Sequence, residues 1–284
     1  MWSIGIYAGD TPFRLLPHPG VSNPVLTGRD VTDVEAEFVA DPFMARRGDA
    51  WHMFFEVMNR ETKRGEIGLA ESADGLVWSY KRIVLAEPFH LSYPYVFEWE
   101  GEHYMIPETL GANAVRLYKA TNFPTEWACL GSLIEGSFAD PSAFRFAGDW
   151  WLFACSTPYR HDTLRLFRAS ALTGPWIEHP ASPVVEGDSL SARPGGRVLV
   201  TNGGVTRFSQ VCFPSYGSRV RAFEIRTLAG AVYSETEHPH SPVLVGSGRG
   251  WNAAGMHHVD PHPVPGGGWL ACVDGLSQLP GAGD

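Results

Sequence analysis

The segment DPFMARRGDAWHMFFEV, Asp41 to Val57, contains a mixed strand pattern, a glycine-containing turn and a second, strongly apolar strand pattern. Because a short glycine-containing turn between two such runs is typical of a β-hairpin, we expect two antiparallel strands here. Asp41 is expected just before the first strand and Glu56 at the end of the second. The hairpin would therefore bring two carboxylates together at its open end.

The same pattern returns four times, each time opening on a residue that precedes proline. The copies are YPYVFEWEGEHYMIPET from Tyr93, DPSAFRFAGDWWLFACS from Asp140, RPGGRVLVTNGGVTRFSQV from Arg193 and DPHPVPGGGWLACVDG from Asp260. Further strand-like runs follow most copies, as in GEIGLAES and LVWSYKRIVL after the first. Four antiparallel strands recurring about every 50 residues are the signature of β-propeller blades. The sequence therefore predicts an all-β, five-bladed β-propeller.

The fifth copy ends before it can supply its outer strands. The run SIGIYAGDTPFRLL, Ser3 to Leu16, aligns with the third strand of the first blade. We therefore expect the N-terminal strands to complete the last blade and close the ring, which removes exposed sheet edges. Residues 1–284 are predicted to form a single propeller domain.

Composition narrows the classes of partner. The formal net charge of −9 argues against a nucleic-acid or anionic-membrane partner and is compatible with neutral sugars or cationic ligands. The four cysteines are far apart and form no CxxC pair, so we interpret them as mostly buried, reduced thiols of a cytoplasmic protein. The N-terminus lacks the pattern of a signal peptide, and no apolar run approaches the roughly 18 residues of a membrane span.

In a propeller blade, the start of the innermost strand and the end of the second meet at one mouth of the central channel. Ten positions should therefore surround this mouth, and six of them are acidic. The strand starts are Asp41, Tyr93, Asp140, Arg193 and Asp260, and the strand ends are Glu56, Glu108, Cys155, Gln210 and Asp274. Crowded carboxylates raise one another's pKa, which can provide a proton donor beside a base, as glycosidic bond cleavage requires.

The chain resembles the five-bladed propellers of the arabinanase and xylosidase type of glycoside hydrolase. Within that superfamily it is most similar to the N-terminal propeller domain of glucosamine inositolphosphorylceramide transferases and its bacterial relatives. The motifs that carry the resemblance are FVADPFM (38–44), SYPYVFEWEGEHYMIPET (92–109), FADPSAF (138–144), ARPGGR (192–197) with Gln210, and GMHHVDPH (255–262). They extend over nearly the whole chain.

The resemblance implies catalytic roles for three residues. Asp41 matches the general base of the arabinanase type, and Asp140 matches the aspartate that tunes the pKa of the acid. That family has its acid glutamate at an inner-strand start, where this chain has Arg193. Glu108 is therefore the substitute candidate for the acid, with Glu56 behind it.

The remaining predicted site residues are expected to contact substrate. They are Glu56, Tyr93, Arg193, Gln210, His257, His258 and Asp260. No metal ligand is assigned, although a histidine at the channel axis leaves a calcium ion open as a cofactor, as in some related hydrolases.

Two functions fit these observations. The first is a carbohydrate-active enzyme that acts on a glycosidic linkage, a glycoside hydrolase. The second is a non-catalytic glycan- or glycolipid-binding propeller that works with a sugar transferase. Turnover on a panel of aryl glycosides would separate the two.

Overall fold

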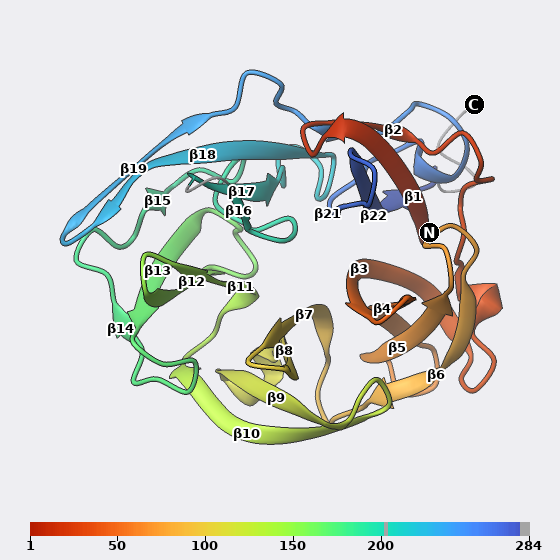
Figure 1. Ribbon diagram of the computed structural model, residues 1–284, viewed down its shortest axis with the longest axis horizontal. Helices are drawn as coiled ribbons and strands as arrows, with labels where there is room; N and C mark the ends of the chain where they lie inside the picture. The colour runs from red at the N-terminus through yellow and green to blue at the C-terminus, as the bar shows by residue number, and fades with distance from the viewer. Residues whose placement is uncertain (202–203, 279–284) are drawn as a thin grey trace.

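The computed structural model describes residues 1–201 and 204–278, which form five β-sheets arranged as the blades of a ring (Figure 1). The predicted five-bladed propeller is thereby confirmed. Blade one contains β3 (Ala36–Arg47), β4 (Ala50–Asn59), β5 (Arg64–Ser72) and β6 (Ser79–Leu85). Blade two contains β7 (Ser92–Trp99), β8 (Glu102–Glu108), β9 (Ala114–Asn122) and β10 (Glu126–Glu135). In both blades the strands pair in sequence order.

The third and fourth blades have a divided outer edge. Blade three contains β11 (Ala139–Phe146), β12 (Asp149–Cys155) and β13 (Thr163–Ala169), with β14 (Ile177–Glu178) and β15 (Val185–Glu186) both pairing with β13. Blade four contains β16 (Leu199–Thr201), β17 (Gly204–Gln210) and β18 (Arg219–Ala229), with β19 (Val232–Glu237) and β20 (Leu244–Val245) both pairing with β18. The hairpin turn expected at residues 202–203 lies outside the described residues.

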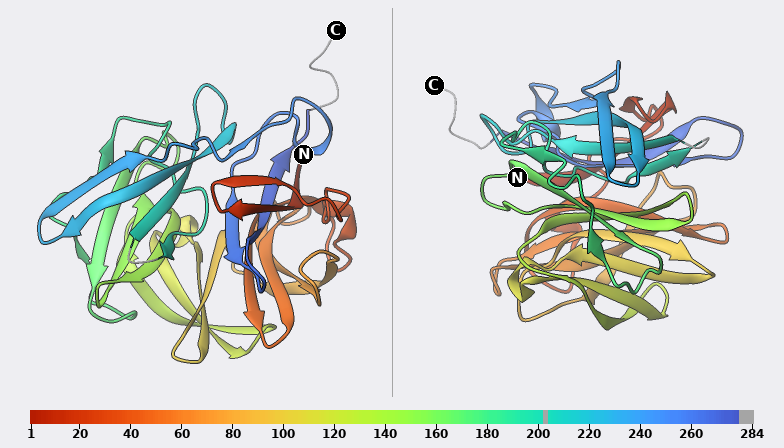
Figure 2. Two further views of the ribbon diagram at one scale, coloured as in Figure 1. Left: turned by 45° about the horizontal axis from the view of Figure 1, so that its top comes forward. Right: turned by 90° about the vertical axis from the view of Figure 1, so that its left-hand side faces the viewer.

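The two ends of the chain share the fifth blade, as predicted. Its strand order is β21 (Val259–Pro263), β22 (Trp269–Leu276), β1 (Trp2–Thr11) and β2 (Arg14–Pro17). Strand β1 pairs antiparallel with β22 over eight residue pairs, from Trp2 opposite Leu276 to Gly9 opposite Trp269. This pairing fastens the N-terminal strands into the ring (Figure 2).

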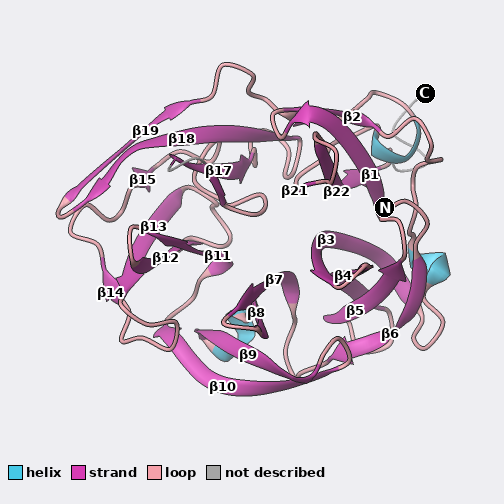
Figure 3. Cartoon of the chain, viewed as in Figure 1, coloured by secondary structure: helices cyan, strands magenta, loops and turns pink. Residues whose placement is uncertain are grey.

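Among the described residues, helices are limited to three single 3-10 turns, drawn in cyan in Figure 3: η1 (Gly28–Asp30), η2 (Leu110–Ala112) and η3 (Gly250–Asn252). Within the described part of the chain, no helix has the length and apolar character needed to cross a membrane.

The core lies between neighbouring blades. The indole of Trp150 on β12 packs with residues of blade two, and that of Trp151 on the same strand packs with residues of blade four. Side chains alternate between the two faces of a strand, so adjacent tryptophans fill the interfaces on opposite sides of one blade. Burying large aromatic side chains in this way holds the blades at fixed positions around the channel.

The inner strands of the first three blades each contain a β-bulge. The pairing register shifts between Ala40 and Phe43, between Ser92 and Tyr95, and between Ala139 and Ser142. The residues at these bulges, each followed by proline, have positive φ angles: 52° at Asp41, 47° at Tyr93 and 51° at Asp140. Non-glycine residues seldom adopt such angles, and strained backbone of this kind concentrates at functional sites.

The structure corrects two expected strand boundaries. Asp41 lies inside β3 rather than before it, and Glu56 lies inside β4, three residues before its end. Blade one therefore has longer inner strands than the hairpin pattern predicts, and the bulge turns Asp41 toward the channel mouth part-way along β3.

The inner segment of the fourth blade is irregular where the sequence reads Arg193-Pro-Gly-Gly-Arg197. Gly196 forms a parallel bridge with Val259 of the fifth blade. A Cβ atom at position 196 would lie 1.8 Å from the Val259 carbonyl oxygen, and φ is +141°, so only glycine fits this close approach.

Candidate functional site at the channel mouth

A small pocket of ≈ 160 Å³ opens at one mouth of the channel. It contains three carboxylates, one guanidinium and two imidazoles. Its lining residues are Trp2, Phe38, Ala40, Asp41, Glu56, His90, Ser92, Glu108, Arg193, Tyr216 and His257. Five of the ten predicted site residues are among them: Asp41, Glu56, Glu108, Arg193 and His257.

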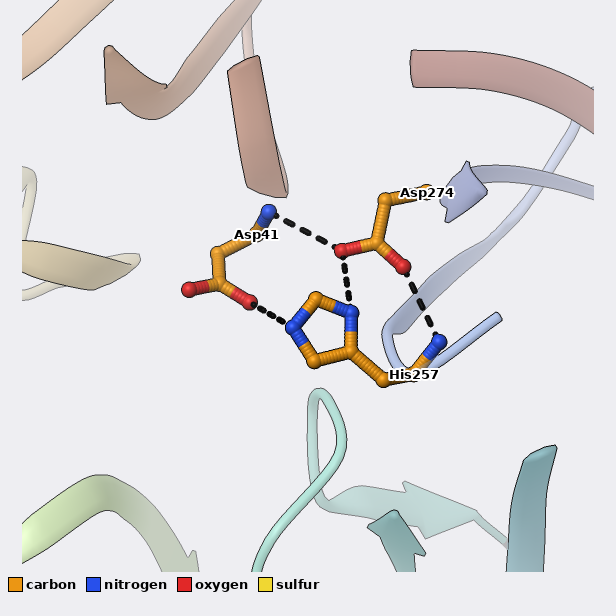
Figure 4. A group of neighbouring side chains, drawn as sticks. All are labelled: Asp41, His257 and Asp274. Carbon is orange, nitrogen blue, oxygen red and sulfur yellow. Dashed lines mark hydrogen bonds and ion pairs between the residues drawn. The ribbon is translucent and has the colours of Figure 1, made fainter. Parts of the chain in front are cut away.

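On one side of the pocket, His257 lies between two aspartates (Figure 4). Its Nε2 is 3.4 Å from Oδ1 of Asp41, and its Nδ1 is 2.7 Å from Oδ2 of Asp274. Asp274 also accepts hydrogen bonds from the backbone N–H groups of Asp41, His257 and His258. Asp274 thus joins the inner strand of blade one to the last blade.

The protonation of these groups follows from burial and charge. Burial opposes a charged imidazole, but the carboxylates of Asp274 and Asp41 outweigh it and raise the pKa of His257 to about 9. Burial favours the neutral form of Asp274, but the His257 charge and several hydrogen bonds lower the pKa of that carboxyl. Burial raises the pKa of Asp41, although His257 opposes this effect. At neutral pH, His257 is therefore an imidazolium beside an ionised Asp274, and Asp41 is a stronger base than an ordinary aspartate.

On the other side of the pocket, Arg193 connects two acids. Its Nε donates to Oδ2 of Asp140 at 2.6 Å, and its Nη2 lies 3.4 Å from both Oδ1 of Asp140 and Oε2 of Glu108. The backbone N–H of Asp140 donates to the same Glu108 oxygen at 3.2 Å. Arg193 also contacts Nδ1 of His161 at 2.9 Å, which fixes the far end of the guanidinium.

Glu108 combines burial with a neighbouring negative charge. Desolvation and the Asp140 carboxylate raise the pKa of Glu108 to about 8, while Arg193 limits the rise. A carboxyl group with this pKa is mostly protonated at pH 7, so it can donate a proton. The site thus contains a protonated acid and a base in one small pocket.

Glu56 and His90 form a third pair at the rim. Nε2 of His90 is 3.2 Å from Oε1 of Glu56. Burial opposes charging of His90, but the bond to Glu56 and the nearby carboxylates raise its pKa. The carboxylates around His90 thus favour the cationic form of its imidazole.

Three other predicted residues stand behind the pocket rather than in its lining. Asp140 is 1% exposed and acts on the pocket through Arg193 and Glu108, and Gln210 donates from Nε2 to Asp140 at 3.0 Å. Tyr93 is 0% exposed, and its hydroxyl contacts Ser142 Oγ and the backbone of Gly196. A direct substrate contact by any of these three stays a prediction.

The structure places Asp260 elsewhere than expected. The fifth blade has no bulge: Val259 lies opposite Val273 and Asp260 opposite Cys272 without a shift. Asp260 therefore lies deeper along the channel, where it accepts from Arg197 and from the backbone N–H of Met44. Burial opposes ionisation, yet Arg197 and His262 lower the pKa of Asp260, so it is an ionised partner in an internal ion pair.

His258 lies in the channel interior, edge-on to Phe43 at 4.5 Å and to Tyr93 at 5.4 Å between ring centroids. It is 0% exposed, and neither ring nitrogen has a hydrogen-bond partner within the part of the chain that the structure describes. Burial lowers its pKa to about 4, so the ring is neutral at pH 7. A neutral imidazole with two unpartnered nitrogens fits a bound water molecule or a hydrated cation at the channel axis.

One group of side chains has the composition of a metal site. Ligand atoms of Asp41, His257 and Asp274 all lie within 4.8 Å of one another. One imidazole and two carboxylates suit a divalent cation. In the described structure these atoms are already engaged with each other, so an ion would have to displace the His257 proton.

Sequence reasoning missed six of the eleven lining residues, and three of these lie outside the repeated hairpin motifs. His90 and Tyr216 come from loops outside the repeated hairpins, and Trp2 comes from the N-terminal strand that closes the ring. Trp2 stacks on His257 with ring centroids 4.0 Å apart. In the sequence, only their position next to segments that end at this mouth indicates that they contribute to the pocket.

The fold is similar to that of solved propellers that include glycoside hydrolases. A putative glycoside hydrolase from Parabacteroides distasonis superposes with a TM-score of 0.68 at 11% identity, covering 95% of this chain and 99% of that one. The α-L-arabinanase of Cellvibrio cellulosa superposes with a TM-score of 0.59 at 19% identity, covering 82% and 86%. These likenesses concern the fold.

The family model described as "Glucosamine inositolphosphorylceramide transferase 1, N-terminal" matches residues 1–276, and the chain belongs to this family. Glucosamine inositolphosphorylceramide transferase 1 of Oryza sativa subsp. japonica is 38% identical over 301 residues, which cover 96% of this chain. The match covers 40% of that relative, so the chain spans about two fifths of its length. The predicted resemblance is confirmed: the chain is a propeller of this family with a glycoside hydrolase-like fold.

Proposed function

We propose that the mouth pocket binds a sugar and hydrolyses its glycosidic bond by acid–base catalysis. The observation that carries this proposal is the pKa of Glu108, raised to about 8 by burial and by Asp140. Such a group is protonated where the reaction needs a donor, and it shares the pocket with the unusually basic carboxylate of Asp41. Paired carboxyl groups with different tasks are the requirement for this chemistry.

In the proposed reaction, Glu108 gives its proton to the oxygen of the leaving group as the bond from that oxygen to the anomeric carbon breaks. A water molecule adds to the anomeric carbon, and Asp41 accepts the proton that the water loses. The His257 imidazolium stabilises the Asp41 carboxylate before the reaction. Asp140 and Arg193 adjust the proton affinity of Glu108 without touching the reacting atoms.

The test is turnover of 4-nitrophenyl glycosides of pentoses, hexoses and 2-amino-2-deoxyhexoses by the full chain. We expect release of nitrophenol from at least one substrate, and loss of that activity in Asp41→Asn and Glu108→Gln. The matched control is Glu102→Gln, an exposed residue on the same strand as Glu108. Absence of turnover across the panel, with sugar binding intact, would contradict the hydrolase.

A second function is favoured by Arg193 and by the length of the relatives. Arg193 stands where the arabinanase-type resemblance expects the acid glutamate, and its Nη2 lies 3.4 Å from Oε2 of Glu108. The relatives that the chain matches are named transferases and are much longer than this chain. In this alternative, the propeller binds the glycan or glycolipid and a sugar transferase provides the catalysis.

The binding alternative predicts a ligand chemistry. Around the mouth, acidic side chains outnumber basic ones, which favours a cationic group: the acids are Asp41, Glu56, Glu108, Asp140 and Asp274, and the bases are His90, Arg193 and His257. The relatives' name includes an amino sugar, so glucosamine is the first probe. Calorimetry should then detect glucosamine binding that weakens in Glu56→Gln, with no turnover of any aryl glycoside. Equal affinities for glucosamine and glucose would refute recognition of the amine.

Two earlier expectations stay proposals. A calcium ion at the channel axis would be held near His258, and added calcium should then raise the melting temperature of the wild type more than that of His258→Phe.

A reducing, cytoplasmic compartment suits the four cysteines, all of which are free.

A further inference from the structure

A second, larger cavity adjoins the carboxylate pocket. It has a volume of ≈ 580 Å³, against ≈ 160 Å³ for the pocket at the mouth. Trp2 lines both, so the two spaces meet at one indole. Sites for drug-sized ligands usually measure about 300–1,000 Å³, so the carboxylate pocket has room for no more than one sugar unit. A ligand of two or more units must extend into neighbouring space.

The larger cavity, here called the tryptophan groove, has a mixed lining. Trp2 and Trp251 contribute indoles, while Thr27, Glu35 and Arg60 contribute hydrogen-bonding groups. A pyranose ring needs this combination, because its C–H face is apolar and its rim carries hydroxyl groups. Aromatic side chains with polar neighbours suit such amphipathic ligands.

The position of the Trp251 indole is determined by the sheet on which it packs. Its indole lies over Gly5 of β1 and Gly275 of β22, and a Cβ atom at either position would come within 2.5 Å of the ring. Two glycines on adjacent strands therefore leave room for the indole to lie close against the sheet. The edge of Tyr7 supports it, with ring centroids 6.5 Å apart.

The position of the Trp2 side chain is also fixed by packing. One neighbour is His257, on which it stacks at 4.0 Å and which belongs to the pocket. The same side chain therefore contacts a residue of the carboxylate pocket and bounds the groove. A ligand unit beside Trp2 would adjoin the unit held by the carboxylates.

From this geometry we propose that the tryptophan groove is a second sugar subsite, which stacks the sugar ring next to the one in the carboxylate pocket. The inference rests on the proposed sugar specificity of the pocket and extends it. The ligand is thus a glycan of at least two units, either a free oligosaccharide or the headgroup of a glycolipid.

The test compares a monosaccharide with its dimer. Calorimetry on the full chain would use glucosamine with its β-1,4-linked dimer, and arabinose with its α-1,5-linked dimer. We expect one dimer to bind the wild type about tenfold more tightly than its monomer, the gain expected for one good stacking contact. A dimer no better than its monomer would overturn the second subsite and leave the pocket proposal standing.

Substitutions show which residues provide the extra affinity of the dimer over the monomer. Trp251→Ala should remove the advantage of the dimer and leave monomer affinity unchanged, whereas Glu108→Gln should weaken both sugars together. Trp251→Phe, which keeps an aromatic surface, should retain part of the advantage and serves if the alanine variant does not fold. Loss of monomer binding in well-folded Trp251→Phe would refute a separate subsite.

The source of the ligand is settled by a further comparison. The affinity of the protein for phosphatidylcholine vesicles that contain glycosyl inositolphosphorylceramide would be compared with its affinity for the same headgroup released from the lipid. Equal Trp251-dependent affinities would identify the glycan itself as the ligand, and binding to vesicles alone would identify a glycolipid. If no monomer, dimer or headgroup binds the wild type, the pocket proposal and the subsite fail together.

Discussion

Replacing Arg193 by methionine tests whether charge balance at the mouth governs stability. Arg193 is 8% exposed and is the cation closest to Asp140, at 2.6 Å, as well as a partner of Glu108 at 3.4 Å. Methionine keeps much of the side-chain volume but leaves the buried Asp140 carboxylate without its closest counter-ion, and it removes the charge that limits the pKa of Glu108. Breaking a buried ion pair by removing one partner destabilises a protein by about 3–5 kcal/mol.

The expected change in melting temperature follows from the size of the chain. At about 2.1 cal/mol/K per residue, unfolding 284 residues carries an entropy of roughly 0.6 kcal/mol/K. A loss of about 3–5 kcal/mol then lowers the melting temperature by about 5–8 °C near neutral pH.

The loss should depend on pH in a stated direction. Burial and Asp140 already raise the pKa of Glu108 to about 8, and Arg193 is the charge that limits this rise. A carboxyl group with a raised pKa in the folded state stabilises the fold at low pH and loses that contribution as pH rises through its folded value. Without Arg193 the free energy of unfolding falls more steeply as pH rises. The variant and the wild type should therefore be most similar in stability near about pH 5.

Urea denaturation at about pH 5 and about pH 7.5 would measure both effects. Arg221→Met is the matched control, because Arg221 pairs with Glu237 at the surface and its loss should change stability by about 1 kcal/mol or less. Adding Asp140→Asn to Arg193→Met should recover part of the loss, since it removes the stranded charge. A loss below about 1 kcal/mol at neutral pH, or a larger loss at low pH, would refute the reasoning.

Three further outcomes are expected. If a glycoside substrate is found, its kcat/KM should fall as pH rises past about 8, the pKa of Glu108, and Glu108→Gln should lower turnover by about 10²–10⁴-fold. The pKa of His257 is raised from 6.5 to about 9, so its ion pairs stabilise the fold fully below about pH 6.5 and this stability is lost as pH rises through about 9. In denaturation experiments, His257→Gln should therefore lose most stability relative to wild type at low pH, and a constant difference would contradict the raised pKa. Gly275→Ala should destabilise by about 1–3 kcal/mol because its Cβ meets the Trp251 ring, whereas Gly20→Ala, on the surface, should be nearly neutral in thermal melts.

The repeated hairpin was enough to predict the ring, because each blade contains its own local signal. Glycine-containing turns and apolar second strands mark the blades independently, so low identity between copies does not hide them. The N-terminal strands were predictable because a blade without outer strands leaves an exposed edge. The same logic placed Asp41, Glu56 and Glu108 at one mouth.

The location of Asp260 was not predictable from the same pattern. Its Asp-Pro pair matches those at Asp41 and Asp140, yet only those two copies form a bulge at the aspartate. The difference depends on the neighbouring blade, because Gly196 bridges to Val259 and holds β21 in regular register. A contact between blades is a tertiary property, and the sequence of one repeat does not contain it.

The channel mouth combines strained backbone with unbalanced buried charge. Three bulges hold non-glycine residues at positive φ, and several buried carboxyl groups share too few cations, whereas Asp260 in the regular fifth blade has a full ion pair with Arg197. Strain and unbalanced charge each destabilise a fold, and neither is required for closing a propeller, as the fifth blade demonstrates. Both occur together at Asp41 and Asp140, at the pocket that Asp41 and Glu108 line. Local conflict of this kind is expected where the structure serves ligand chemistry rather than stability.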